Sequence, residues 1–369
     1  MTVRPYRTWV EVSTGAIRWN LGQFKRYFDN KALIAPVIKA NGYGHDMSLV
    51  AKTLDTGRIW GFCVAYDTEA QELLKQGITK PILVLSAWQR QNLVPLIKKN
   101  VRIVVCDIAS AHEIERAARQ ARKPALVHMK VDTGTTRIGT RPEHIDTFRR
   151  SLSASRWITV EGIFSHYADS ESERLAPARR QRALFISALG GMRVPLVHMA
   201  CSAASLRLPV PPTNLVRLGI GLYGLWPSDA TRRHAPQGFS LRPALSWKTR
   251  VFQVKTVPAR TTVGYARTYT TKRTTTIAVL PVGYADGYDR RASNTSHVMI
   301  RGRRCPVIGR VSMNLTIVDC GPSSPIESGD EVVLIGKGAP ADAVAASWDT
   351  IHYEAVTRID RAIPRIAVA

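Results

Sequence analysis

The sequence predicts an α/β protein: an N-terminal (β/α)8 barrel of the TIM type, followed by a mostly β C-terminal domain. Three observations lead to this prediction. Eight short apolar runs alternate with amphipathic stretches between residues 33 and 220, polar or glycine-rich residues follow several of these runs, and the pattern becomes strand-like after about Leu225. The chain has 369 residues, enough for two domains, which we expect at 1–238 and 239–369.

The first domain begins with an expected extended arm at residues 4–12, ahead of the barrel pattern. Helices are expected between the barrel strands, as at 67–74, where Asp67 is a candidate N-cap and Gly77 follows the end, and at 107–114. The expected barrel strands are the eight apolar runs, at 33–38, 59–64, 82–85, 101–106, 125–131, 160–164, 195–199 and 215–220.

After the barrel, residues 226–238 have the composition of a polar, proline-containing linker. From Leu241 onward, alternating and β-branched segments predict strands, and helices are expected only at 342–348 and 350–356. The expected strands of this domain are 251–257, 274–280, 298–300, 311–319 and 331–335.

The chain is strongly basic, with 52 Lys and Arg against 28 Asp and Glu and a formal net charge of +24. A basic nucleic-acid binder is therefore one alternative, and it predicts an affinity that depends on salt. The basic residues are spread along the whole chain, however, and no long basic tail or nucleic-acid motif is recognised. We expect the charge to serve solubility and to attract small anions rather than nucleic acid.

We expect neither a membrane span nor a secretory signal. No window has 18 consecutive apolar residues, and the first nine residues lack an apolar core. The cysteines are scattered without a CxxC pair, which is typical of a reducing cytoplasm and argues against a disulfide framework and a zinc site. They are Cys63, Cys106, Cys201, Cys305 and Cys320.

Lys39 stands where the first apolar run stops and the turn residues Asn41, Gly42 and Gly44 begin. A buried lysine is costly unless it is paired or its pKa shifts. A lysine that has lost its proton is a nucleophile that forms Schiff bases with aldehydes. The structural alternative is a lysine whose stem covers apolar surface while its amine stays in water.

The stretch V-I-K-A-N-G-Y-G-H, residues 37–45, resembles the signature of alanine racemases, the fold-type III enzymes that use pyridoxal 5'-phosphate (PLP). The resemblance extends over both domains and nearly the whole chain. It implies that PLP is the cofactor, that Lys39 binds it as a Schiff base, and that Tyr43 contacts its phosphate.

The segment K-V-D-T-G-T-T-R-I-G, residues 130–139, resembles the racemase segment whose arginine contacts the PLP phenolic oxygen and the substrate carboxylate. This assigns Arg137, for which the alternative is a surface charge in a loop, and its planar fork suits a carboxylate. The resemblance also implies that Lys130 is carbamylated by CO2 and holds Arg137. It further implies that His166 orients Arg217, which faces the pyridine nitrogen and weakens PLP as an electron sink.

A barrel often holds phosphate with backbone amides near its last two strands. Ser202 and the G-I-G sequence at 219–221 occupy that place, and the alternative for the glycines is close packing. Cys201 departs from the asparagine usual in the family before this serine. With the resemblance, the candidate phosphate ligands are Tyr43, Ser202, Gly219, Ile220 and Tyr353.

The C-terminal domain supplies T-V-G-Y-A, residues 262–266, which resembles the segment carrying the second catalytic base. Racemisation removes a proton from one face of the α-carbon and returns one on the other, so the resemblance assigns Lys39 to one face and Tyr265 to the other. A tyrosine has a pKa near ~10 unless nearby positive charge lowers it. The structural alternative for Tyr265 is a half-buried strand residue.

Three further residues of this domain are expected close to the substrate. Tyr284 lies in the family-like loop G-Y-A-D-G-Y at the substrate entrance, and Met313 and Asn314 follow later in the chain. In the family Tyr265, Tyr284 and Met313 enter the active site of the other subunit, which implies a homodimer with shared sites. Asn314 stands where the family usually has aspartate, so a negative charge is lost and an amide donor gained. We expect it to tune ligand selectivity, and the alternative is neutral drift at a tolerant position.

The function that the resemblance implies is a cytoplasmic isomerase that interconverts L-alanine and D-alanine, in either cell-wall (peptidoglycan) precursor synthesis or alanine catabolism. Two alternatives also use PLP: a broader-range racemase acting on serine or other small amino acids, and a non-catalytic PLP-binding protein. Contacts in the substrate pocket decide whether the racemase has a broader range, because one methylene changes the discrimination between substrates by only ~1–3 kcal/mol. Proteins of the second kind lack a β domain such as residues 241–369.

Overall fold

The computed structural model describes residues 6–29, 31–55, 58–210 and 212–369. They form two compact units, which divide between Arg242 and Pro243. The barrel unit comprises residues 17–42 and 47–242, and the β unit comprises residues 43–46, residues 243–369 and the described residues up to Ala16. The domain boundary expected between 238 and 239 stays a prediction. Within the described ranges, no helix is both long and apolar enough to cross a bilayer.

The barrel unit is built on eight parallel strands, hydrogen-bonded in the order β2-β9-β8-β7-β6-β5-β4-β3. Just beyond β2, Val37 forms a parallel bridge with Cys63 of β3, and the Ile38 N–H donates to the Cys63 carbonyl at 2.9 Å. The sheet is therefore closed, and the predicted (β/α)8 barrel is confirmed. The strands are β2 (Leu33–Pro36), β3 (Phe62–Val64), β4 (Ile82–Val84), β5 (Arg102–Val105), β6 (Ala125–Lys130), β7 (Ile158–Phe164), β8 (Leu196–His198) and β9 (Leu215–Leu218).

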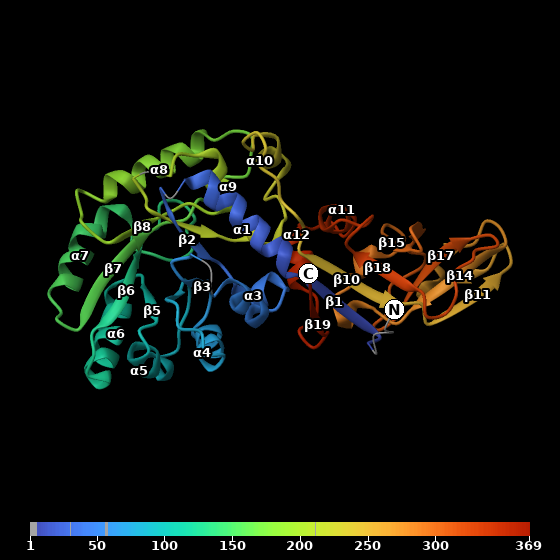
Figure 1. Cartoon of the computed structure of the whole chain (residues 1–369), viewed down its shortest axis with the longest axis horizontal. Coiled ribbons are helices and arrows are strands. Elements are labelled where there is room, and N and C mark those ends of the chain that lie inside the picture. The colour runs from blue at the N-terminus through green and yellow to red at the C-terminus, as the bar shows by residue number, and fades with distance from the viewer. Residues whose placement is uncertain (1–5, 30, 56–57, 211) are drawn as a thin grey trace. The chain divides into compact units, whose positions relative to one another are not determined.

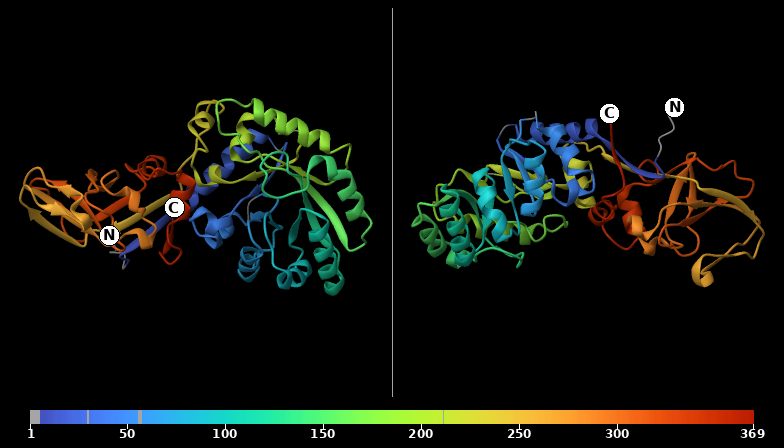
Figure 2. Two further views of the ribbon diagram at one scale, coloured as in Figure 1. Left: turned by 180° about the vertical axis from the view of Figure 1, so that it is seen from behind. Right: turned by 90° about the horizontal axis from the view of Figure 1, so that it is seen from below.

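Helices lie on the outer side of these strands, as α4 to α8 show in Figures 1 and 2. They run between the end of one strand and the start of the next, which makes successive strands parallel. The helices from the first to the tenth, with two 3-10 turns, are α1 (Thr14–Phe28), α2 (Lys39–Tyr43), α3 (Met47–Leu54), α4 (Asp67–Lys75), α5 (Arg90–Lys98), α6 (Ile108–Ala121), η1 (Pro142–His144), α7 (Ile145–Ser153), α8 (Ala176–Ala188), α9 (Ser202–Arg207), η2 (Ile220–Tyr223) and α10 (Asp229–Arg233).

Two helix starts show how the sequence sets element boundaries. Helix α6 begins after Asp107, whose Oδ1 accepts a hydrogen bond from the Ser110 N–H at 2.7 Å, as expected of an N-cap aspartate. The expected N-cap of α4 is wrong: Tyr66 is the N-cap, and Asp67 is the first helical residue. The Asp67 carboxylate instead accepts from the Gln89 N–H at 2.8 Å, so it connects α4 to the start of α5.

The β unit contains a six-stranded sheet (β16-β15-β18-β10-β1-β19), a three-stranded sheet (β11-β14-β17) and the ribbon β12-β13. Trp247, Tyr288 and Trp348 form an aromatic core, with neighbouring ring centres 5.9 and 5.2 Å apart. The elements are β1 (Thr8–Ser13), β10 (Leu245–Arg250), β11 (Gln253–Val257), β12 (Thr262–Val263), η3 (Tyr265–Arg267), β13 (Tyr269–Thr270), β14 (Thr275–Leu280), η4 (Tyr284–Asp286), η5 (Arg290–Ala292), β15 (His297–Ile300), β16 (Arg303–Pro306), β17 (Thr316–Gly321), β18 (Glu331–Ile335), α11 (Ala341–Ser347), α12 (His352–Thr357) and β19 (Arg365–Val368).

Several elements differ from the sequence-based expectation. The expected arm is an internal strand, β1, which pairs antiparallel with β10 and parallel with β19, while residues 4–5 lie outside the described ranges. The expected linker contains α10, because the Ser228 Oγ caps it by accepting from the Thr231 N–H at 3.1 Å. The strand expected from residue 311 begins only at Thr316, after a turn. The sequence does not predict the short strands β10, β16 and β19.

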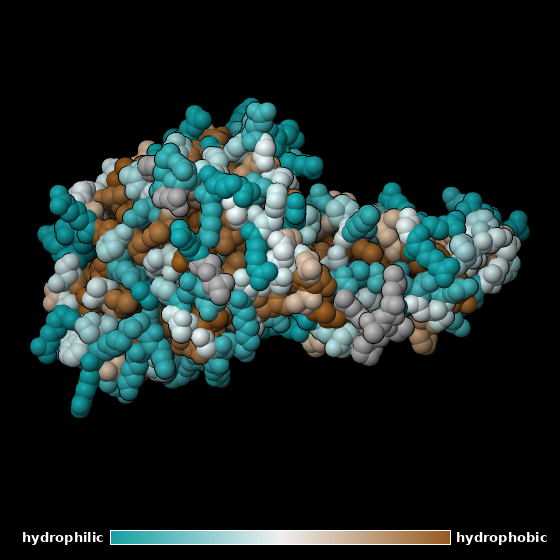
Figure 3. Space-filling view, viewed as in Figure 1, coloured by the Kyte–Doolittle hydropathy of each residue, from teal (hydrophilic) through white to brown (hydrophobic). Residues whose placement is uncertain are grey.

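Hydrophilic side chains are scattered over the barrel unit among apolar ones on the face shown in Figure 3. This distribution matches the sequence, in which the basic residues are spread along the chain rather than concentrated in one segment.

Candidate active site

The backbone adopts the left-handed conformation immediately after Lys39. Residues 40–42 have φ angles of 52°, 53° and 62°, a conformation that costs non-glycine residues roughly 1–2 kcal/mol each. The Glu69 carboxylate holds this turn, because it accepts hydrogen bonds from the Ala40 N–H at 2.7 Å and from the Ala65 N–H at 2.8 Å. Strain of this kind persists only where the surroundings enforce it, and it is common at functional sites.

Lys39 itself is half-buried at the C-terminal end of β2. Burial is the main reason that its pKa lies below the ordinary value, and the charges of Arg137 and Arg217 lower that pKa further, against the opposing charge of Glu69. A lowered pKa increases the fraction of unprotonated amine at neutral pH. Lys39 therefore has the protonation behaviour that a nucleophilic lysine needs.

Arg217 lies in strand β9, and its guanidinium is buried at the same end of the barrel. Its Nη1 donates to His198 Nδ1 at 2.7 Å, and its Nη2 donates to the Ser165 carbonyl at 2.8 Å and to His166 Nδ1 at 3.1 Å. The structure thus brings the predicted pair His166 and Arg217 into direct contact. Because an arginine only donates, His166 Nδ1 must accept, and a neutral His166 carries its hydrogen on Nε2.

Behind Arg217, a chain of buried histidines leads to a carboxylate. His198 Nε2 lies 2.8 Å from His128 Nδ1, and His128 Nε2 lies 3.1 Å from Glu161 Oε2. Arg217 makes His198 Nδ1 an acceptor, so each neutral histidine donates from Nε2 to the next group in the chain. Burial lowers the pKa of both histidines, which keeps them neutral. The chain fixes the orientation of Arg217 from behind.

Glu161 ends this relay as a carboxylate. Burial alone would raise its pKa, but hydrogen bonds from His128 and from Arg102 outweigh that effect and hold the pKa at about 2. The Arg102 Nε and Nη2 donate to its two oxygens at 2.8 and 2.9 Å. Glu161 is therefore ionised at every physiological pH, and it anchors the relay as a pure acceptor.

Lys130 is a second buried lysine, at the end of β6. Its Nζ donates to the Val131 carbonyl at 3.0 Å and lies 5.3 Å from the ring centre of Phe164. Burial and then the charge of Arg217 lower its pKa to about 8, although Asp132 opposes this. Lys130 therefore has a much larger neutral fraction near pH 7 than an ordinary lysine, and the neutral amine is the form that adds CO2.

Arg137 lies on the exposed loop that follows Lys130. The Asp132 Oδ1 accepts from the N–H groups of residues 134, 135 and 136 at 3.0, 3.0 and 3.1 Å, which fixes the loop backbone. The Arg137 guanidinium remains exposed, and its charge lowers the pKa values of Lys39 and of His166. A fixed loop with an exposed fork is suited to binding a small carboxylate.

Ser202, at the start of α9, meets the end of β9. Its Oγ accepts from the Gly219 N–H at 3.0 Å and from the Gly221 N–H at 3.2 Å. Both lone pairs of this hydroxyl are thus used, and its hydrogen is left to donate to a ligand. Gly221 is also required by packing, since a Cβ there would lie 2.8 Å from the Phe24 ring.

Tyr43 and Tyr353 lie together in the β unit, with ring centres 6.4 Å apart. Gly44, at φ 81°, packs so closely on α12 that a Cβ would overlap the Val356 carbonyl, and the Arg365 Nε donates to the Gly44 carbonyl at 3.1 Å. This close packing holds residues 43–46 in the β unit. The two tyrosines expected at the phosphate are therefore neighbours.

The remaining candidates, which we call the exposed patch, are exposed side chains of the β unit: Tyr265, Tyr284, Met313 and Asn314. The Tyr284 N–H donates to the Ser312 carbonyl at 3.1 Å, and the Ala285 N–H donates to the Met313 carbonyl at 3.0 Å. The first three patch residues are 72%, 42% and 57% exposed. The loops of Tyr284 and Met313 are thus hydrogen-bonded to each other, and large exposed side chains on neighbouring loops indicate a surface that contacts another molecule.

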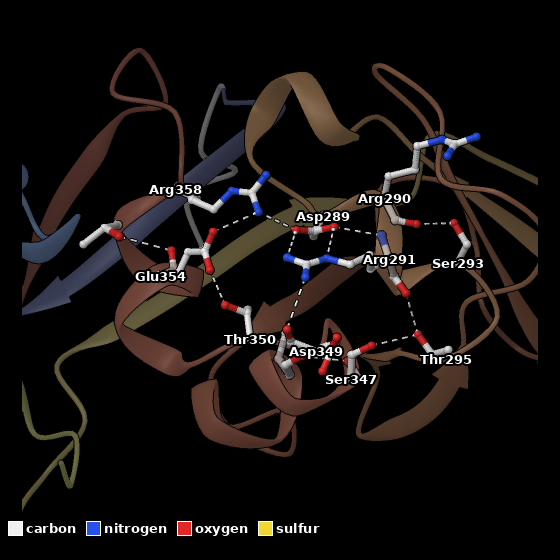
Figure 4. Close-up of polar contacts among 12 residues, drawn as sticks. Asp289, Arg290, Arg291, Ser293, Thr295, Ser347, Asp349, Thr350, Glu354 and Arg358 are labelled. Atoms are coloured by element: carbon white, nitrogen blue, oxygen red, sulfur yellow. Dashed lines mark hydrogen bonds and ion pairs between the residues drawn. The ribbon is translucent and has the colours of Figure 1, made fainter. Parts of the chain in front are cut away.

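A polar network fixes the loop that follows Tyr284 (Figure 4). The buried Asp289 accepts from the Arg291 N–H at 2.8 Å and pairs with the guanidinium groups of Arg291 and Arg358. Arg358 directly follows α12, the helix that carries Tyr353. The network therefore connects the backbone next to the exposed patch with the helix that holds a candidate phosphate ligand.

The structure brings the barrel candidates together at the C-terminal ends of the strands, and the positive charges of Lys39, Lys130, Arg137 and Arg217 suit an anionic ligand such as a phosphate with a carboxylate. Sequence reasoning missed four supporting residues, Glu69, His128, Glu161 and His198. The only signal for the two histidines is a polar residue inside each of two apolar strands. The barrel candidates are Lys39, Lys130, Arg137, His166, Ser202, Arg217, Gly219 and Ile220.

Two family models match this chain: "Alanine racemase, N-terminal domain" at residues 12–227 and "Alanine racemase, C-terminal domain" at residues 244–367. The chain is 39% identical to an alanine racemase of Symbiobacterium thermophilum, over 97% of this chain and 96% of the relative. It is 37% identical to alanine racemase 2 of Bacillus subtilis, over 98% and 94% of the two chains.

Solved structures of alanine racemases also match this chain over nearly its whole length. An alanine racemase from D-cycloserine-producing Streptomyces lavendulae matches with a TM-score of 0.93 and 31% identity, over 99% of this chain and 98% of that chain. An alanine racemase of Clostridium difficile 630 matches with a TM-score of 0.92 and 32% identity, over 99% and 96%. Both the barrel and the β unit are covered by these matches.

Proposed function

The chain belongs to the alanine racemase family, and we propose that it interconverts L-alanine and D-alanine at the barrel site with bound PLP. It is an amino-acid racemase, an isomerase. The observation that most supports the barrel site is Lys39, which stands at a strand end with a pKa lowered by burial and by two arginines.

The barrel residues fit PLP in chemistry and in charge. Lys39 Nζ would bind its aldehyde, and Arg137 would contact its phenolic oxygen and the substrate carboxylate. When bound, PLP supplies an electron sink that makes the α-hydrogen of the amino acid acidic. The residues that would hold its phosphate are Ser202, Gly219, Ile220, Tyr43 and Tyr353.

Arg217 would face the pyridine nitrogen. An arginine does not give up its proton at physiological pH, so it donates a hydrogen bond without protonating the ring. The contact with His166 and the relay behind His198 support this role, because they fix the guanidinium in one orientation. An unprotonated ring is a weaker electron sink, which favours rapid return of the proton over transamination.

Lys39 and Tyr265 of the partner subunit are the proposed bases. Lys39 Nζ would take the α-proton on one face, and the Oη of the partner's Tyr265 would return a proton on the other. The 72% exposure of Tyr265 supports this arrangement, because an exposed side chain can reach a second protomer. Tyr284, Met313 and Asn314 would then line the substrate side of the partner's site. The catalyst is thus a homodimer with shared active sites.

We propose that Lys130 carries a carbamate. The Lys130 ammonium would lose one proton, and the neutral amine would then add CO2 and release a second proton, so that a buried cation becomes an anion near Arg137 and Arg217. The change would offset the concentrated positive charge and hold Arg137 by an ion pair. Labelling with 13C-bicarbonate should give a carbamate carbon signal that disappears in Lys130→Arg, and a signal that survives this substitution would contradict the assignment.

The scattered free cysteines support a cytoplasmic location for the enzyme. There its product would serve as a peptidoglycan precursor or connect to alanine catabolism.

Borohydride reduction of the purified holoenzyme, followed by peptide mapping, tests the proposed function. We expect a pyridoxyl group on Lys39 and, in the unreduced enzyme, conversion of L-alanine to a racemic mixture in a chiral assay. A pyridoxyl group on another lysine would overturn the site assignment. Cofactor on Lys39 without racemisation of alanine would overturn the substrate assignment.

A further inference from the structure

Cys305 and Cys320 face each other across two neighbouring strands of the β unit. Cys305 lies in β16 and Cys320 in β17, both are free thiols, and their exposures are 1% and 5%. Val307, two residues after Cys305, forms an antiparallel bridge with Val318, two residues before Cys320. Because side chains alternate with a period of two, the cysteines share the inward face with these valines and occupy the next cross-strand pair.

The register places the cysteines where a disulfide can form. The Ile308 N–H donates to the Ile317 carbonyl at 2.9 Å, so Val307–Val318 is a non-hydrogen-bonded pair, and the alternation makes Cys305–Cys320 another. Such pairs have Cα atoms about 4.5 Å apart, within the ~4.4–6.8 Å range that disulfides span. The Cys305 Sγ donates to the Arg303 carbonyl at 3.8 Å, and the Cys320 thiol lies close enough to Cys305 to change its pKa.

We propose that Cys305 and Cys320 are a redox-sensitive modification site, a dithiol that a hydroperoxide oxidises to a reversible disulfide. The Cys305 thiolate attacks the peroxide O–O bond, which forms a sulfenic acid and, after proton transfer, releases an alcohol or water. The Cys320 sulfur then attacks the sulfenic sulfur, the S–S bond forms, and water leaves. In total, two thiols lose two electrons and two protons, and one peroxide is reduced.

The surroundings make Cys305 the first to react. The neighbouring Cys320 thiol and then the charge of Arg303 lower the pKa of Cys305 against the opposing effect of burial, whereas the Cys305 thiol and burial both raise the pKa of Cys320. By contrast, burial raises the pKa of Cys63 to about 12 and that of Cys106 to about 11. Cys63 and Cys106 are therefore natural unreactive controls.

The pair lies at a seam between two sheets. Strand β16 is the edge of the six-stranded sheet, and β17 is the edge of the three-stranded sheet. Pro306, next to Cys305, has no N–H to donate across the seam. Edge strands with an interrupted ladder open locally more easily than central strands, which gives a small peroxide access to buried sulfur.

A disulfide here would join the two sheets and close the loop of residues 306–319. This loop carries Met313 and Asn314, so any effect on catalysis rests on the proposed function. The crosslink itself does not, because it needs only the two thiols and an oxidant. In a reducing compartment the pair would stand as two thiols and close only under oxidative conditions.

The test uses the full-length holoenzyme, reduced and then treated with hydrogen peroxide. Remaining thiols are alkylated under denaturing conditions, and peptides are mapped without reduction. We expect one linked peptide pair, Cys305–Cys320, which a dithiol reductant removes, while Cys63 and Cys106 are recovered alkylated. Amide hydrogen exchange over 306–319 should slow on oxidation.

Cys320→Ser is the matched variant. It should show no linked pair and no slowing of exchange, and it should accumulate a sulfenic acid at Cys305 that dimedone captures. Recovery of Cys305 and Cys320 of the oxidised wild type as alkylated thiols, or as sulfinic acids without a link, would overturn the proposal. The wild-type mapping decides the question even if this variant folds poorly, and neither result depends on racemase activity.

Discussion

The barrel site and the exposed patch of the β unit hold their functional residues in opposite ways. In the barrel, Arg217 is buried and its guanidinium makes four hydrogen bonds, and a chain of two histidines fixes it from behind. In the β unit, Tyr265 is 72% exposed and lies on a short 3-10 turn. The first arrangement fixes charge and orientation within one chain, whereas the second leaves side chains available to another molecule.

If Lys39 and Tyr265 are the two bases, as we propose, this difference reflects what each base requires. Lys39 must keep a lowered pKa, and it gains this from burial and from the fixed cations of its own barrel. Tyr265 must reach the other face of the substrate, and an exposed position on a neighbouring unit allows this without crowding the barrel. We therefore expect barrel substitutions to affect chemistry and stability together, and patch substitutions to affect chemistry alone.

The largest expected effect is that of Lys39→Ala. On the proposed function, the variant loses both the residue that would attach PLP and one base, so kcat should fall at least about a thousandfold. Steady-state racemisation of both alanine enantiomers measures this, with Tyr265→Phe as the control from the patch. Tyr265→Phe should keep the bound cofactor spectrum, and loss of that spectrum in both variants would remove the contrast between the two regions.

The next largest expected difference between the barrel and the β unit is in the free energy of unfolding. Glu161→Gln removes an ionised acceptor whose pKa is about 2 when folded, against an ordinary 4.5. Its contribution is fully present above pH 4.5 and is lost as the pH falls through about 2. We expect Glu161→Gln to destabilise the protein by about 2–3 kcal/mol at pH 7, and the difference from the wild type in urea unfolding should shrink between pH 4.5 and 2.5.

Asp289→Asn is the matched variant in the β unit. Asp289 is also a buried carboxylate between two cations, but its partners Arg291 and Arg358 are 48% and 41% exposed, whereas Arg102 of the barrel is 15% exposed. Solvent screens the exposed partners, so we expect a loss of about 1 kcal/mol. If Glu161→Gln and Asp289→Asn lost equal free energies of unfolding, this would contradict the view that the buried barrel network stabilises the protein more than the Asp289 network does.

The sequence predicts the barrel because of how parallel strands are buried. A strand covered on both faces is a continuous apolar run, so the eight runs match the eight strands, and Lys39 is conspicuous at the end of the first. The β unit is harder to predict. Strand β16 has two exposed arginines among four residues, and β1 and β19 pair with each other from opposite ends of the chain.

The sequence offers candidates for the site where the residues form a local motif, but it does not indicate the supporting residues that depend on distant contacts. His128, Glu161 and His198 are separated by more than thirty residues each and meet only because β6, β7 and β8 are adjacent. In the same way, the fifteen-residue separation of Cys305 and Cys320 gives no sign of a pair until the register of β16 and β17 is known.

The smallest expected effect is that of Asn314→Asp in the patch. The substitution adds a negative charge without changing shape, so it should alter ligand selectivity and leave racemisation largely intact. Kinetics with alanine and serine, and inhibition by the cyclic mimic D-cycloserine, measure this. If all three stay within about twofold, less than ~0.5 kcal/mol, Asn314 does not tune the site.

The central claim is that the exposed patch of one chain completes the barrel site of another. Mixing inactive Lys39→Ala and Tyr265→Phe proteins under conditions of subunit exchange tests it most directly, because one site of each mixed dimer would hold both bases. With exchange verified by native mass spectrometry, we predict recovery to about a quarter of the wild-type activity, the share of intact sites in a random mixture of dimers. Complete exchange without any return of activity would contradict the shared site.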